Sequence, residues 1–331
     1  MYLWTYNVLI DCVNEAREVI VPRLTKTQLL TKDKLMICLF FITPPLLWSC
    51  NFIVGRAIRN DLSPFMITFS RWLIALMVIL PFAYKYLKRD FHQYLQYPIR
   101  VIATAVTGVL SFSLLVYFGL HHTSSTNALL LNSCVPVFIL LFSAVVYKQP
   151  LSGRQILGLC LSFTGVLSII FKGDLKGLLS LQLSQGDLLL LMAMISFAFY
   201  TLWLKKIPYS VNRLGLLSIQ IVITLLATLP FILWEGYSDG SQQHWGNDIY
   251  LAVLFLGICP SFISYLLFSR CVEAIGAERA GFSIHLIPIF GVILSLLFLG
   301  ESIHWFHVVG SATILFGVGL SSMQSKRNAL S

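Results

Sequence analysis

The feature that most constrains this chain is a series of long apolar runs that carry almost no charge. Ten such runs follow one another, and each has the roughly 20 residues that an α-helix needs to cross a bilayer. The runs are continuous and rich in Leu rather than alternating, which favours helices over the strands of a barrel. We therefore predict an all-α integral membrane protein with ten transmembrane helices. The expected spans are 35–57, 63–84, 98–118, 125–147, 154–171, 186–204, 211–233, 248–270, 277–299 and 303–322.

Composition and charge distribution support the same class. Charged residues make up 11% of the 331 residues, against about a quarter in soluble domains. The net charge of +9 is not gathered in one patch, which argues against a nucleic-acid partner. With the loops assigned alternately to two sides, 18 of the 23 Lys and Arg residues lie on the side of the termini and 4 on the other. The positive-inside rule then predicts that both termini are cytoplasmic.

The chain repeats itself internally. A constant offset of 152 aligns residues 127–170 with 279–322, and it matches Ala128 with Ala280, Pro136 with Pro288, and Gly158 with Gly310. The repeating unit has five helices, so the second copy enters the membrane in the opposite direction. Such inverted repeats can expose one central site to each side in turn. The expected parts are a leader (1–34, an amphipathic surface helix or an inert segment), two repeats (35–171 and 186–322), a linker (172–185) and a tail (323–331).

One segment resembles a known family. Residues 48–72, WSCNFIVGRAIRNDLSPFMITFSRW, resemble the opening of an EamA domain, with Trp and Asn in the first helix, Ser-Pro opening the second, and Arg-Trp within it. The repeated blocks resemble the closing helices of the same domain. The resemblance implies a ten-helix member of the drug/metabolite transporter superfamily, which moves small metabolites, often amino acids, across a bacterial inner membrane. Residues 186–235 depart from the pattern, with neither motif present.

Interior helix breaks indicate where a transported solute would bind. Prolines fall near the middle of three expected spans, at Pro136, Pro260 and Pro288. Such breaks either line a cavity with freed backbone groups or only shape helix packing. Polar and aromatic side chains on the same helices complete our candidate substrate-binding set: Trp48, Asn51, Arg71, Ser111, Tyr117, Asn132, Tyr200, Ser264, Tyr265 and His285.

Two of these residues carry most of the chemistry. Arg71 is the one full charge away from the ends of the spans, and placing it there costs about 2.5–3.5 kcal/mol on insertion scales. We therefore expect Arg71 to face inward, bonded to Asn51, a helix carbonyl or a substrate carboxylate. His285 is the one deep histidine, and it either carries a coupling proton or forms a neutral hydrogen bond between helices.

These patterns predict a secondary transporter that exports small organic metabolites by alternating access. No phosphate-binding GxxxxGK[ST] motif occurs, so we expect no use of ATP, and the residues suggest no metal and no cofactor. The expected partners are a small-molecule substrate, the lipid bilayer, and a coupling proton or counter-substrate, with the protein a monomer or a homodimer. Two alternatives are a lipid-modifying enzyme in the membrane and a structural membrane protein without transport activity.

Overall fold

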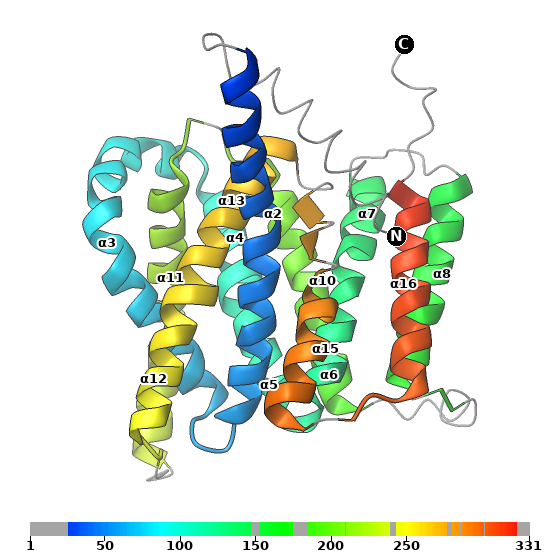
Figure 1. The fold of residues 1–331 in the computed structure, drawn as a ribbon. Helices are drawn as coiled ribbons and strands as arrows, with labels where there is room; N and C mark the ends of the chain where they lie inside the picture. Colours follow the sequence, from blue (N-terminus) through cyan, green and yellow to red (C-terminus); the bar gives the residue numbers. More distant parts are fainter. Residues whose placement is uncertain are drawn as a thin grey trace.

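The protein is a bundle of helices whose axes are roughly aligned, with successive helices running up and down the bundle (Figure 1). Its computed structural model describes residues 26–146, 153–171, 173–174, 184–208, 210–238, 243–276, 280–281, 283–284, 286–300 and 302–322. No strand occurs within these ranges. The tail, most of the linker and the leader up to residue 25 lie outside them, so the expected surface helix is not described.

Six helical segments are long and apolar enough to cross a membrane. They are α3 (Pro64–Gln96), α4–η1–α5 (Pro98–His122), α6–η2–α7 (Ser125–Val146), α10 (Gln185–Lys205), α11 (Arg213–Ser238) and α12–η3–α13 (Asn247–Ile275). The other long described helices are α2 (Lys26–Ala57), α8 (Gly153–Ile170), α15 (Leu286–Leu299) and α16 (Trp305–Ser322). The predicted all-α membrane fold is confirmed, whereas the count of ten spans stays a prediction.

One helix extends well beyond its predicted end. The apolar run ends near residue 84, but α3 continues to Gln96. The extension is held by contacts with the segment before α11: the carboxylate of Asp90 accepts the backbone N–H of Asn212 at 2.9 Å, and Ser210 donates to Gln93 at 2.8 Å. Helix α3 therefore outlasts its apolar run because its polar residues pack against the other repeat.

Contacts between the two repeats occur in matched pairs. Helix α2 packs against α13 and α15, and α10, which corresponds to α2 in the second repeat, packs against α5 and α7. The corresponding helices α3 and α11 pack against each other, as do α8 and α16 (Figure 1). This exchange pattern is what a pseudo-two-fold axis between inverted repeats produces.

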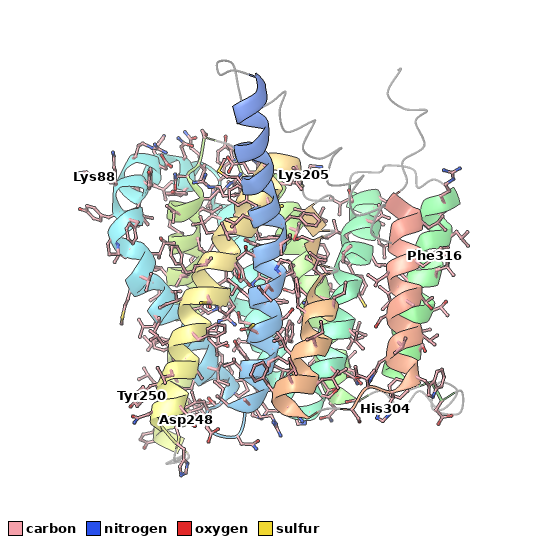
Figure 2. The ribbon with its side chains drawn as sticks, viewed as in Figure 1. Lys88, Lys205, Asp248, Tyr250, His304 and Phe316 are labelled. Carbon is pink, nitrogen blue, oxygen red and sulfur yellow. The ribbon has the colours of Figure 1, made fainter. Side chains whose placement is uncertain are left out.

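Charged and polar side chains mark the two ends of the bundle. Figure 2 shows Lys88 and Lys205 at one end, called the proximal end here, and Asp248 and His304 at the other, called the distal end. Phe316 points away from the bundle on α16 and is 67% exposed. Exposed apolar side chains of this kind form the surface that a bilayer would contact.

Candidate functional site

Two π-helices occupy equivalent places in the two repeats. Segment η1 covers Ala105–Ser111 and η3 covers Gly257–Ile263, so the offset of 152 relates them residue for residue. Pro260 lies in the middle of η3, where it lacks the N–H that an α-helical hydrogen bond needs. Its counterpart is Gly108. The predicted interruption at Pro260 is therefore a π-helix, and the first repeat contains the same feature without a proline.

The backbone carbonyls of these π-helices accept hydrogen bonds from aromatic side chains. The indole N–H of Trp48 donates to the Pro260 carbonyl at 3.1 Å, and the Tyr265 hydroxyl donates to the Gly108 carbonyl at 2.6 Å. Tyr200, the counterpart of Trp48, lies against Gly108, where an added Cβ would come within 2.1 Å of its ring. The first repeat thus packs Trp48 on the π-helix of the second, and the second repeat packs Tyr200 and Tyr265 on that of the first.

Arg71 is the centre of a buried polar network. Its side chain is 2% exposed. The guanidinium donates from Nε to the Ser261 hydroxyl at 2.7 Å, and from Nη1 to the Asn51 carbonyl oxygen at 2.9 Å and to the Tyr117 hydroxyl. The Tyr117 hydroxyl in turn donates to Asn51 at 2.8 Å. The expected bond between Arg71 and Asn51 is present, and the network reaches the second repeat through Ser261.

The charge of Arg71 has no counter-ion within the described part of the chain. All three of its side-chain hydrogen-bond partners are neutral, the centroid of the Trp72 ring lies 4.8 Å from the guanidinium carbon, and no described carboxylate forms an ion pair with it. Its second terminal nitrogen, Nη2, donates no hydrogen bond to any described residue. A buried charge is stable only when it is well paired, so this nitrogen is suited to receive an anionic group.

A small cavity of about 10 Å³ lies beside this network. That volume is at the lower limit of what one water molecule needs. Four of the predicted site residues line it, together with apolar side chains from both repeats: Trp48, Asn51, Phe52, Arg71, Phe112, Asn132, Phe197, Ile284 and Ile287. Of the five apolar residues, the sequence suggested only Phe112, as an aromatic residue near the helix breaks. The other four were missed, since an apolar side chain in an apolar span carries no distinguishing pattern.

The remaining predicted aromatic and hydroxyl residues lie around the cavity rather than in its wall. Tyr200 and Tyr265 belong to an aromatic cluster, with ring centroids 5.9 Å apart. Ser264 donates within its own helix, to the carbonyl of Cys259 at 3.2 Å. Ser111 is half-buried at the end of η1 and does not line the cavity.

Pro136 and Pro288 each lie in the first turn of a helix. A short 3₁₀ segment, η2 (Asn132–Cys134), comes directly before α7 (Val135–Val146), which has Pro136 as its second residue. Pro288 lies in the first turn of α15. His285 lies outside the described residues.

Sequence reasoning missed Ser49, whose hydroxyl is 2.9 Å from the Ile287 carbonyl and so joins α2 to α15 at this level.

Together, the fold and this interior define a class: multi-pass α-helical membrane proteins built from two related halves around a central polar site. The chain belongs to the EamA-like transporter family, whose family model matches residues 35–171 and 184–323. It is therefore a membrane transporter. Among the described residues, no group of three or more His, Cys, Asp or Glu is arranged to hold a metal ion.

Two relatives support this assignment, and a solved structure supports the fold. "Uncharacterized transporter YyaM" of Bacillus subtilis is 25% identical over 66% of this chain and 70% of its own length. An "Uncharacterized transporter" of Archaeoglobus fulgidus is also 25% identical, over 84% of this chain and 94% of its own. A crystal structure that is 17% identical matches with a TM-score of 0.57 over 86% of this chain and 96% of its own, which shows a shared fold.

Proposed function

We propose that this protein is a secondary transporter that exports amino acids or related carboxylate-bearing metabolites across a bacterial inner membrane. The observation that carries the proposal is the buried Arg71 guanidinium, which has only neutral partners and lines a cavity between the repeats. An ionisable side chain inside a membrane usually marks a substrate or ion pathway. A carboxylate would supply the missing negative charge and bond to the planar guanidinium.

Asn51 and Asn132 would recognise the rest of the solute. Both side chains are 3% exposed and line the same cavity as Arg71. An amide side chain offers both a donor and an acceptor, so it can bond to an ammonium or a hydroxyl of the substrate. Trp48 and Phe197, whose ring centroids are 5.4 Å apart, would contact an apolar side chain. A small zwitterion with an apolar group fits this set of contacts.

The size of the cavity and the repeat both support alternating access. A space of about 10 Å³ is too small for an amino acid. The repeats must therefore separate before a solute enters, and inverted repeats can do so toward either side. With both termini cytoplasmic, the distal end faces the periplasm and export runs from the proximal to the distal end. A proton or a counter-substrate drives the cycle without ATP.

Counterflow in proteoliposomes tests this function. The purified protein is reconstituted and loaded with single unlabelled amino acids, and uptake of each labelled amino acid is compared with uptake of its methyl ester, which lacks the carboxylate charge. We expect uptake of at least one free amino acid and exclusion of its ester. Arg71→Gln should abolish that preference. The matched control is Arg89→Gln, because Arg89 has a side chain that is 57% exposed outside the cavity.

Two results would overturn the proposal. One is the absence of counterflow for every carboxylate tested while the protein remains folded. The other is equal discrimination between acid and ester by Arg71→Gln and Arg89→Gln, which would show that the guanidinium has only a structural role.

A further inference from the structure

A second, much larger pocket opens at the distal end. Its volume is about 650 Å³, within the usual range for ligand sites. Asn127 of α6 and Asp187 of α10 line it, and the same two segments reach the central cavity at Asn132 and Phe197. At 1.5 Å per residue, these pairs place the pocket about 8–15 Å beyond the cavity along the helices. The pocket therefore lies between the central site and the distal surface.

The hydrogen bonds around His307 indicate which of its ring nitrogens carries the proton. The backbone N–H of His304 donates to Nδ1 of His307 at 3.2 Å, so Nδ1 carries no proton. The proton is then on Nε2, which lies 3.2 Å from the carbonyl oxygen of Asn127. The Asn127 amide nitrogen is 3.4 Å from the carboxylate of Asp187, which also accepts the Thr123 hydroxyl at 2.7 Å. In this arrangement Nδ1 of His307 is a hydrogen-bond acceptor and Nε2 is a donor.

This network links the two repeats at the distal end. Asn127 and Thr123 belong to the first repeat, whereas Asp187 and His307 belong to the second. All four side chains are buried, with exposed fractions between 1% and 8%. The two repeats are therefore joined at the distal end by a chain of polar contacts that begins at one imidazole.

His307 also caps the helix that carries it. Helix α16 begins at Trp305, so His304 is its N-cap residue and His307 is its third residue. A side chain at the third position that accepts the N-cap N–H is half of a capping box. A second proton on Nδ1 would turn this acceptor into a donor that faces the His304 N–H. It would also place positive charge at a helix N-terminus, where the helix dipole disfavours it.

The other groups around the pocket set the local charge. Arg56 at the end of α2, His122 at the end of α5, and His304 in the α15–α16 turn line it together with Asp187. Arg56 donates to the backbone carbonyl of Leu120. Asp187 brings a negative charge to this wall and Arg56 a positive one. Histidine is the side chain whose unperturbed pKa puts its change of charge between about pH 5 and 8.

We propose that His307 is a proton-binding site at the distal end, and that its protonation releases the α15–α16 turn and widens the distal pocket. The proton comes from the distal solvent and binds to Nδ1. The capping bond to His304 then breaks, and the turn, which forms one wall of the pocket through Gly300, Ser302 and His304, moves away. This site differs from His285, the residue that the sequence suggested for a coupling proton.

Thiol labelling in nanodiscs tests the proposal without any transport measurement. Ser184 lines the pocket and makes no capping hydrogen bond, so Ser184→Cys is a suitable reporter. Asn247→Cys, exposed at the start of α12 at the same end, is the reference for the intrinsic pH dependence of maleimide reactivity. Labelling of the unsubstituted protein is subtracted from both. We expect the labelling rate of Ser184→Cys, divided by that of Asn247→Cys, to rise several-fold when the pH is lowered from 8 to 5.5.

Variants at position 307 make the test specific. Gln at this position accepts the His304 N–H and donates to Asn127 but does not titrate, so His307→Gln should keep the ratio low at both pH values. His307→Lys, which has only donors, should keep it high at both. His122→Gln, which removes another histidine of the pocket, should respond to pH as the unsubstituted protein does.

Two outcomes would overturn the proposal: a ratio that does not change with pH in the His-containing protein, or an unchanged response in His307→Gln. Neither outcome requires His307→Lys to fold. Because no solute is present, the result does not depend on the proposed amino-acid transport. A failed counterflow assay would leave it standing.

Discussion

The backbone oxygen of Gly310 lies where a side chain on Gly165 would have to be, since a Cβ added to Gly165 would be 2.5 Å from it. The reciprocal contact joins Gly317 to the carbonyl of Gly158, also at 2.5 Å. The offset of 152 converts each contact into the other. Helices α8 and α16 therefore touch backbone to backbone at two symmetric points, as small residues allow in membranes.

Gly165→Ala should lower the free energy of unfolding by about 1–3 kcal/mol, because the backbone cannot move aside as a flexible side chain would. Denaturant titration in mixed micelles measures the change. Gly236→Ala is the matched control, since nothing lies within 4 Å of its added Cβ. Equal stability of the two variants would contradict close packing of α8 on α16.

Ser261→Ala should destabilise the protein by about 1.5–3 kcal/mol, because a donor of the buried Arg71 guanidinium then loses its acceptor. The same titration measures it. Ser70→Ala is the control, since Ser70 bonds only to backbone carbonyls of its own helix. If both serine variants unfold alike, Arg71 does not depend on the second repeat for its pairing.

Gly108→Ala should destabilise the protein because the added methyl group would overlap the ring of Tyr200. Tyr200→Leu should relieve much of that overlap. In a double-mutant cycle we therefore expect the two changes to be non-additive by about 0.5–3 kcal/mol, with the double variant more stable than the sum predicts. Additive effects would mean that Tyr200 does not lie against η1 in the membrane.

Trp48→Phe should remove the hydrogen bond to the Pro260 carbonyl and part of a buried ring system. The lost hydrogen bond costs about 0.5–1.5 kcal/mol, and the cavity left by the smaller ring adds to that cost. Trp234→Phe provides the comparison, since Trp234 is 73% exposed. Circular dichroism during heating reports both stabilities. A Trp48→Phe protein as stable as Trp234→Phe would show that the π-helix carbonyl needs no donor.

The sequence predicts much of the architecture because membrane solvation and repetition leave clear patterns. Apolar runs identify the helices, the offset of 152 identifies the halves, and an isolated Arg71 among apolar residues must turn inward and bind a partner. Asn51 was a reasonable partner because it lies at a similar depth on the neighbouring helix. These inferences need only spacing along the chain.

Other parts of the interior depend on three-dimensional contacts that no local pattern encodes. The bond from Tyr265 to the Gly108 carbonyl joins positions 157 residues apart. From the sequence alone, Asp187 is an ordinary acidic residue in the first turn of a helix. In the structure it is 1% exposed, and its carboxylate contacts Thr123 and Asn127. The end of α3 was misjudged for the same reason, since hydropathy does not register polar contacts with a distant segment.

The matched π-helices also bear on the history of the chain. A π-helical turn holds one residue more than the α-helical turn it replaces, so it corresponds to a single inserted residue. Segments η1 and η3 begin and end at positions 152 residues apart, with no gap between the copies. One insertion in an ancestral five-helix unit is the simplest account of both turns. On that account the irregular turn is older than the repeat itself.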